Sequence, residues 1–390
     1  MEIGGSVAGG FEAVRDAFAR QLPEVGEGGA AFAATAGGRV VVDLWAGRAG
    51  CRPWSAPTRA VLMSATKGIV ATAVALLADR SLLDVDAAVA DYWPEFAARG
   101  KAEISIAQLL SHSAGLISVP GYADFLGTAG EGWEQTSRIV KRLETASPQW
   151  APGTGHGYHG LTFGWLVGEL VRRVTGATVG TVIRAGIAGP LGLELDLGTP
   201  AEQLRLVAPV VLAGPALTGS VQDRQLADPT SPLSQMILAV NGRCILNTAD
   251  AFFADDVRLA MELPALNATG TARGLARLYG VLAGEGRSGD LELLSPKVID
   301  EFTRERRRGP SRVTGDEERW ALGFQRPVQD PVEPSHAWGP HDEAFGHTGL
   351  GGQIGFADPV SQVSVALLRS HLSSVSPLGG HLVSAFYSCL

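Results

Sequence analysis

A serine and a lysine stand three residues apart at the start of the apolar stretch "MSATKGIVATAVALLA", residues 63–78. On a helix, residues at this spacing share a face, so the Lys67 amine can reach the Ser64 hydroxyl. A helix N-terminus and an apolar site both disfavour the ammonium form, which lowers the pKa of a lysine toward that of a useful base. The spacing therefore predicts Ser64 as a nucleophile and Lys67 as its base. The alternative is that Ser64 caps the helix and Lys67 extends into water.

Tyr158 is the second candidate, in the glycine- and histidine-rich segment "GHGYHG" that precedes an amphipathic stretch. A tyrosine beside a lysine amine can carry a proton from the serine hydroxyl to a leaving group. The alternative is an aromatic ring that packs the loop onto the following helix. His156 and His159 in the same segment form an H-x-x-H pair, but a loop carries them and no acidic third ligand follows at a useful spacing. We therefore expect no metal site here.

The third candidate is "HTGLGGQIG", which begins at His347. A glycine-rich edge strand leaves room for an extended substrate and can present a backbone N–H to a developing oxyanion. A plain hairpin turn would use the same glycines, so this alternative stays open.

Periodicity indicates the elements that must position these residues. Phe11, Val14, Phe18 and Leu22 have helical spacing, and residues 29–47 indicate two strands joined at Gly37-Gly38. The run from Ser64 to Asp79 is apolar on most sides, which predicts a buried helix. Strand-like alternation returns beyond Arg319, and residues 381–390 are expected to close the chain as a helix.

Between about residues 84 and 300, helical stretches such as 162–176 and 270–286 alternate with connections that contain proline and glycine. Strands at both chain ends with helices between them predict an α/β (α+β) fold, in which one antiparallel sheet flanked by helices is formed from both termini. We expect a sheet lobe from residues 1–84 and 300–390, which includes the helix of Ser64, and a mainly helical lobe from 85–299. The irregular stretch 196–250 is expected to form surface loops near a cleft.

The composition indicates a folded protein, with 45% hydrophobic and 18% charged residues among 390. A net charge of −8 and a single short basic run at 304–309 argue against nucleic acid or an anionic membrane as a partner. Three widely spaced cysteines, Cys51, Cys244 and Cys389, suggest neither a disulfide framework nor a zinc site. Without an apolar leader or a run of about 18 apolar residues, the expected location is the cytoplasm.

The segments "SATK", "IAQLLSHSAGL", "GYHGLTFGWLVGEL" and "HTGLGG" occur in an order and at separations that resemble the β-lactamase-related serine hydrolases. This family includes class C β-lactamases, DD-peptidases, family VIII carboxylesterases, D-amino-acid amidases and some acyltransferases. The resemblance extends from about residue 10 to 385. It implies a transpeptidase-like fold, shared by β-lactamases and penicillin-binding proteins, with the active site in the cleft between a sheet lobe and a helical lobe.

Carried over to this chain, the resemblance implies that Ser64 is acylated, Lys67 activates it and Tyr158 shuttles the proton. The triplet from His347 to Gly349 matches the K-T-G or H-T-G element of the family. The resemblance also implies an oxyanion hole formed by the backbone N–H groups of Ser64 and Leu350.

Two departures from the class C pattern bear on the substrate. Gly160 stands where the tyrosine motif Y-x-N has an asparagine that binds the substrate amide, and His347 replaces a lysine. A histidine near its reference pKa of roughly 6.5 is mostly neutral at pH 7, which weakens the attraction for a substrate carboxylate. Both changes, and the lack of an export signal, argue against penicillins and acyl-D-Ala-D-Ala as main substrates.

The sequence therefore predicts a serine carboxylesterase that hydrolyses a small-molecule ester through an acyl-enzyme and needs no cofactor. An acyltransferase or thioesterase acting on a secondary metabolite is the nearest alternative, since only the acceptor of the acyl group differs. An amidase or peptidase for D-configured substrates comes next. A binding protein that kept the fold without turnover is disfavoured by the joint presence of Ser64, Lys67 and Tyr158.

Overall fold

The computed structural model describes residues 1–212, 220–328, 338–373 and 377–390. Within these residues the main sheet has seven strands, and every neighbouring pair is antiparallel. Strands from the two chain ends meet where β2 pairs with β15, with Ala33 opposite Ala366. The predicted fold class is thereby confirmed. The strand order is β1 (Ile3–Val7), β3 (Arg39–Ala49), β2 (Gly29–Ala36), β15 (Val363–Arg369), β14 (Gln353–Asp358) and β13 (Phe345–Gly349), with β4 (Arg52–Pro53) beside β3.

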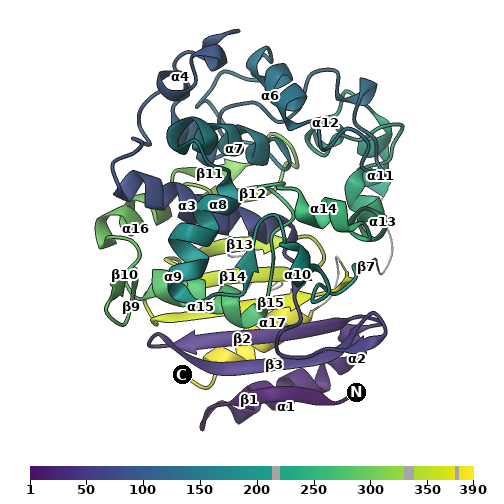
Figure 1. Ribbon diagram of the computed structural model, residues 1–390, viewed down its shortest axis with the longest axis vertical. Coiled ribbons are helices and arrows are strands. Elements are labelled where there is room, and N and C mark those ends of the chain that lie inside the picture. Colours follow the sequence, from purple (N-terminus) through teal and green to yellow (C-terminus); the bar gives the residue numbers. More distant parts are fainter. Residues whose placement is uncertain (213–219, 329–337, 374–376) are drawn as a thin grey trace.

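Helices cover both faces of this sheet (Figure 1). Helices α1 (Glu12–Arg20) and α17 (Leu378–Tyr387) pack together on one face, over the side chains of Phe32, Val365 and their neighbours. Helix α15 (Ala272–Ala283) lies on the other face, where small residues allow a close approach. A Cβ on Gly280 would lie only 2.6 Å from Thr35 Oγ1. The predicted N-terminal helix, hairpin and closing helix are confirmed, whereas the edge strand β1 was not predicted.

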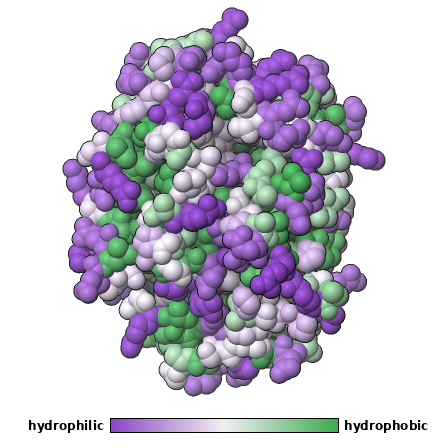
Figure 2. Space-filling model, in the orientation of Figure 1, coloured by the Kyte–Doolittle hydropathy of each residue, from purple (hydrophilic) through white to green (hydrophobic). Residues whose placement is uncertain are grey.

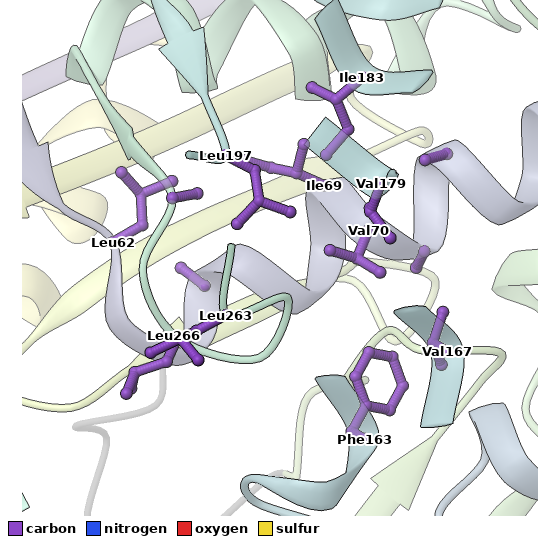
Figure 3. Close-up of a cluster of buried hydrophobic side chains, with 14 of the residues drawn as sticks. Leu62, Ile69, Val70, Phe163, Val167, Val179, Ile183, Leu197, Leu263 and Leu266 are labelled. Atoms are coloured by element: carbon purple, nitrogen blue, oxygen red, sulfur yellow. The ribbon is translucent and has the colours of Figure 1, made fainter. Parts of the chain in front are cut away.

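Helix α3 (Thr66–Asp79) runs through the centre of the molecule and follows a 3₁₀ turn, η1 (Met63–Ala65). All of its residues from Thr66 to Leu77 are buried, which confirms the predicted buried helix. Hydrophobic side chains from several distant segments point toward α3, as Figure 3 shows for Phe163, Val179 and Leu263. Burial of each such side chain contributes roughly 1.5–3 kcal/mol, so this helix is a rigid base for the residues at its start.

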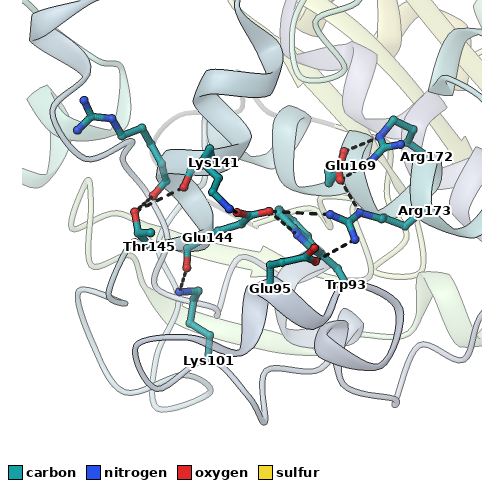
Figure 4. Close-up of polar contacts among 10 residues, drawn as sticks. Trp93, Glu95, Lys101, Lys141, Glu144, Thr145, Glu169, Arg172 and Arg173 are labelled. Carbon is teal, nitrogen blue, oxygen red and sulfur yellow. Dashed lines mark hydrogen bonds and ion pairs between the residues drawn. The ribbon is translucent and has the colours of Figure 1, made fainter.

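A buried polar network joins the helices above the sheet (Figure 4). The fully buried Lys101 ammonium donates to the backbone oxygens of Glu144 and Ala146, and so satisfies carbonyls at the end of α6 (Thr136–Glu144). The Glu144 carboxylate accepts from the Trp93 indole. Arg173, near the end of α7 (Thr162–Thr175), lies 3.9 Å from Glu144. The network thereby ties α6 to α7, the helix that begins just after Tyr158.

Short elements make up most of the helical region. The predicted helical stretches 162–176 and 270–286 contain α7 and α15. The structure describes residues 196–250 as short elements and turns, apart from 213–219, which lie outside the described residues. The further helices are α2 (Leu22–Val25), α4 (Val89–Tyr92), η2 (Pro94–Ala97), α5 (Ile106–Leu110), η3 (Tyr122–Asp124), α8 (Val179–Ile183), η4 (Arg184–Ala188), α9 (Gly189–Leu191), α10 (Ala201–Leu204), α11 (Ser220–Ala227), α12 (Pro232–Met236), η5 (Ile245–Thr248), α13 (Ala249–Phe253), α14 (Asp256–Ala260) and α16 (Pro296–Thr303). The further strands are β5 (Ala60–Val61), β6 (Leu195–Asp196), β7 (Val211–Leu212), β8 (Thr269–Gly270), β9 (Arg287–Ser288), β10 (Leu291–Glu292), β11 (Arg307–Pro310), β12 (Glu317–Trp320) and β16 (His371–Leu372).

The division into lobes at residues 84 and 300 stays a prediction. Helix α15 belongs by sequence to the segment expected in the helical lobe, yet its main contacts are with β2, β14 and β15 of the sheet. On the face shown in Figure 2, hydrophobic residues occur in small groups among hydrophilic ones. Within the described parts of the chain, none of the helices combines the length and the apolar character that crossing a membrane requires.

Candidate active site

Ser64 lies on the 3₁₀ turn before α3, not within the α-helix. Met63 just before it has φ = 50°, a left-handed conformation that is uncommon for a residue with a side chain and is concentrated at functional sites. The N-cap residue of α3 is Ala65, and no side chain caps this helix end. The structure therefore contradicts the reading of Ser64 as a helix cap. The turn instead leaves the Ser64 hydroxyl free to face the Lys67 amine.

The Lys67 side chain is fully buried, so the alternative that it extends into water is also wrong. Its Nζ donates to the backbone oxygen of Ala265 at 2.9 Å and lies 3.3 Å from Ser64 Oγ. Burial holds the pKa of Lys67 well below its usual value, because the ammonium form loses its hydration. A neutral amine in this position can donate one N–H to the Ala265 oxygen and accept a proton from the Ser64 hydroxyl with its lone pair.

The carbonyl that receives Lys67 is held in place by the segment around it. Asn267 is fully buried, and its side chain accepts from the Leu263 N–H and donates to the Arg258 and Met261 carbonyls. The Ala268 N–H donates to the Thr66 hydroxyl on α3. This segment thereby fixes the Ala265 oxygen over the start of α3. No local sequence pattern marks this segment, because its contact with Lys67 joins residues 198 positions apart in the chain.

Tyr158 lies in the loop before α7 with its ring 4.8 Å from Lys67 Nζ. Burial raises the pKa of its hydroxyl, whose oxygen has no hydrogen-bond partner among the described residues. Tyr158 is therefore a neutral phenol at pH 7. Its ring stacks on Trp320 of β12 at a centroid distance of 5.5 Å, and the edge of His112 contacts it from another side at 5.0 Å. The structure thus brings Ser64, Lys67 and Tyr158 together.

Hydrogen bonds of His159 and His112 hold the loop that carries Tyr158 in place. His159 accepts the Leu116 N–H at Nε2, so its proton is on Nδ1, which donates to the Gly157 carbonyl at 2.7 Å. The His159 N–H in turn donates to His112 Nδ1. Burial lowers the pKa of His159 to about 4, so it stays neutral. Both of its ring nitrogens are occupied by the backbone, which leaves neither for a metal in the H-x-x-H pair.

His347 is buried on β13, and its Nδ1 lies 2.6 Å from the Thr348 carbonyl. Burial, and secondarily the nearby Lys67, lower the pKa of His347 to about 3. The residue therefore carries no charge at neutral pH. Its pKa lies further below 7 than the reference value of roughly 6.5 that was assumed from the sequence. A substrate carboxylate finds no fixed positive charge here.

The turn after β13 brings a second backbone segment against the serine. The Gly352 N–H donates to the Gly349 carbonyl, and Gly351 has φ = 81°, as the third position of a type II turn requires. A Cβ on Gly349 would lie 2.5 Å from the Leu62 oxygen and 3.1 Å from the Ala65 nitrogen, so only glycine permits this approach. The Leu350 amide therefore lies on the turn that packs against the Ser64 turn.

A cavity of about 210 Å³ opens beside Tyr158 and Thr348. Trp320 and Gln325 form part of its wall. The Gln325 amide oxygen accepts both the Thr348 N–H and the Thr348 hydroxyl, at 2.8 and 2.9 Å. His112, Trp320 and Gln325 were not among the residues assigned a role from the sequence. Of these three residues, only His112 lies in one of the segments that carry the family resemblance, "IAQLLSHSAGL".

Comparison with known proteins agrees with this geometry. The beta-lactamase family model matches residues 14–378. An esterase/beta-lactamase, LipL of Mycobacterium tuberculosis, is 36% identical over 94% of this chain and 82% of its own length. The crystal structure of a family VIII carboxylesterase superimposes with a TM-score of 0.85 at 34% identity, covering all of both chains. EstA from Arthrobacter nitroguajacolicus Rue61a has a TM-score of 0.83 at 28% identity, covering 100% of this chain and 98% of its own.

Proposed function

Because the chain belongs to the beta-lactamase family, we propose that it is a serine carboxylesterase that acts on small-molecule esters through an acyl-enzyme on Ser64. The observation that carries this proposal is the fully buried Lys67 amine, 3.3 Å from the Ser64 hydroxyl. An activated serine needs a base within hydrogen-bond reach that is neutral at working pH, and burial supplies that state. The names of LipL, EstA and the family VIII carboxylesterase support the ester as the substrate class.

Acylation begins when the lone pair of Lys67 takes the Ser64 proton as Oγ attacks the ester carbonyl. The backbone N–H groups of Ser64 and Leu350 stabilise the oxyanion of the tetrahedral intermediate. When the intermediate collapses, the leaving alkoxide takes the proton of the Tyr158 hydroxyl, and the Lys67 ammonium returns a proton to the tyrosine. The raised pKa of Tyr158 fits this step, since a phenol at neutral pH has a proton to give.

Deacylation follows the same route in reverse. A water molecule attacks the acyl-enzyme, its proton passes through Tyr158 to Lys67, and the Ser64 oxygen leaves with a proton from Lys67. The carboxylic acid is released and all three side chains return to their starting states.

The polarity around His347 favours neutral esters over β-lactams that carry a carboxylate. His347 is neutral, and the Thr348 hydroxyl gives its proton to Gln325, so neither offers the donor that a carboxylate needs. Gly160 also leaves the amide-binding position of the class C motif without a side chain.

A panel of chromogenic substrates tests the proposal. We expect p-nitrophenyl butyrate to be hydrolysed with a much higher kcat/KM than nitrocefin or D-alanine p-nitroanilide. A fluorophosphonate should add one adduct mass to the wild type and none to Ser64→Ala, which should also lose ester hydrolysis while it remains folded. A Ser64→Ala variant with near-normal turnover, or a wild type that prefers nitrocefin, would contradict the proposal.

A further inference from the structure

The cavity beside Tyr158 contains a carboxylate that the proposed mechanism does not use. Glu318 of β12 lines this cavity together with Tyr158, Trp320 and Trp338, and its side chain is 16% exposed. Trp320 and Glu318 lie on the same face of β12, since the indole N–H donates to the carboxylate at 2.8 Å. The carboxylate is therefore fixed in the wall of a pocket that Tyr158 and Thr348 also line.

Glu318 has no cationic partner among the described residues. Its nearest basic neighbour is His156, with Nε2 3.8 Å from the carboxylate, and burial lowers the pKa of that histidine. His156 Nε2 itself is buried without a hydrogen-bond partner. A carboxylate that is mostly removed from water and lacks a counter-charge is costly, and the cost falls when a cation binds beside it.

The two arginines of the same cavity are already engaged. Arg319 forms an ion pair with Glu305 at 2.5 Å and donates to the Pro327 carbonyl at 2.7 Å. Arg326 donates to the backbone oxygens of Thr303 and Asp342. These contacts bind both arginines to other parts of the protein, neither forms an ion pair with Glu318, and Arg326 Nε is buried without a hydrogen-bond partner among the described residues.

The Thr348 hydroxyl is one of the other polar groups of the wall. The Thr348 hydroxyl donates its single proton to Gln325, so toward the cavity it can only accept a hydrogen bond. Tyr158 and Trp320 add aromatic surface, which attracts cations through the negative face of the ring. The wall thus combines hydrogen-bond acceptors, a mostly buried carboxylate without a cationic partner among the described residues, and aromatic rings, while its two arginines are engaged elsewhere. This combination suits a group with positive charge and N–H donors.

We propose that this pocket binds a protonated amine carried by the ester substrate, with Glu318 as its counter-ion. The inference rests on the proposed esterase function and specifies its substrate class. The amine belongs either to the alcohol part or to the acyl part of the ester, and matched substrates separate the two.

Two pairs of isosteric esters test it with the wild-type enzyme at pH 7. Dimethylaminoethyl acetate and isopentyl acetate differ in the alcohol part only by a protonated nitrogen in place of a CH. Methyl 4-(dimethylamino)butanoate and methyl 5-methylhexanoate differ in the same way in the acyl part. We expect the amine to raise kcat/KM at least about tenfold in one of the two pairs, because a cation that is removed from water is attracted by the carboxylate and by the face of an aromatic ring.

The variant Glu318→Gln keeps the shape and an acceptor for the Trp320 indole but removes the charge. The ratio of kcat/KM for the amine ester to that for its neutral isostere should then fall to near one. Both esters react through the same Tyr158, so any effect of Glu318 on that residue changes both kcat/KM values equally and cancels in the ratio. The control is Glu103→Gln, a change of the same kind at an exposed residue, which should leave the ratio as in the wild type.

The possible outcomes distinguish the amine-binding inference, the role of Glu318 and the proposed esterase function from one another. Hydrolysis of the neutral esters without a preference for either amine ester would overturn this inference and leave the esterase proposal intact. A preference that survives Glu318→Gln would reject Glu318 as the counter-ion. If neither the neutral esters nor p-nitrophenyl butyrate are hydrolysed, the proposed function itself fails.

Discussion

Replacing Lys67 with methionine tests the protonation state on which the mechanism depends. Burial holds the pKa of Lys67 well below its usual value in the folded protein, whereas unfolding returns it to about 10.4. Between these two values the unfolded chain binds one proton more than the folded protein. The unfolding free energy of the wild type therefore rises with pH by about 1.4 kcal/mol per pH unit in that window. Below the folded pKa both states are protonated, above about 10.4 both are neutral, and in either range this slope vanishes.

Methionine has a similar length and binds no proton, so subtracting the Lys67→Met variant from the wild type isolates the titration of this lysine. The difference at any one pH also contains the loss of the hydrogen bond to Ala265, which costs about 1–3 kcal/mol when the carbonyl stays unpaired. That second contribution does not change with pH. The change of this free-energy difference with pH, and not its size at any one pH, therefore reports the pKa of Lys67.

Urea unfolding followed by tryptophan fluorescence, repeated between about pH 6 and pH 10, measures this slope. Lys297→Met, at an exposed lysine of α16, controls for the loss of one lysine at the surface. In an ester assay Lys67→Met should lose about 10²–10⁴-fold in kcat, the usual cost of removing a general base. A difference in unfolding free energy that stays constant over the whole pH range would show a charged lysine in the folded protein. It would refute the assignment of Lys67 as the base.

Two further variants probe the neighbours of Ser64. Tyr158→Phe keeps the stacking on Trp320 but removes the shuttling hydroxyl, so kcat for p-nitrophenyl butyrate should fall by about 10²-fold or more at unchanged Tm; retention of kcat within about threefold would contradict the shuttle. Gly351→Ala should destabilise the protein by about 1–3 kcal/mol and lower kcat, because its Cβ would lie 2.3 Å from that of Leu372 at φ = 81°. Gly289→Ala, with φ = 58° and open space around it, is the control and should keep full activity; equal kcat for the two variants would argue against the turn as part of the oxyanion hole.

Local patterns of the sequence were sufficient for several elements. The apolar run after Ser64 predicted a buried helix, because a helix with apolar side chains on all sides is stable only when other elements cover all sides of it. The glycine pair at 37–38 between two β-branched or alanine-rich runs predicted the hairpin. The short edge strand Ile3–Val7 was missed, because two of its five residues are glycines and its pairing with β3 is decided by the distant strand.

Residue types and their order were thus enough to place candidate residues at the start of α3, in the loop before α7 and on β13. The protonation states of these residues depend on packing between distant segments. The pKa of Lys67 falls because segments from elsewhere in the chain bury it beneath the Ala265 carbonyl. The pKa of His347 falls because the turn of Ser64 and helix α3 pack on β13 and bury it, and secondarily because Lys67 lies nearby. His159 is a structural residue because two remote backbone groups occupy its ring. Desolvation and long-range hydrogen bonds depend on what packs against a residue, and spacing along the chain does not contain that information.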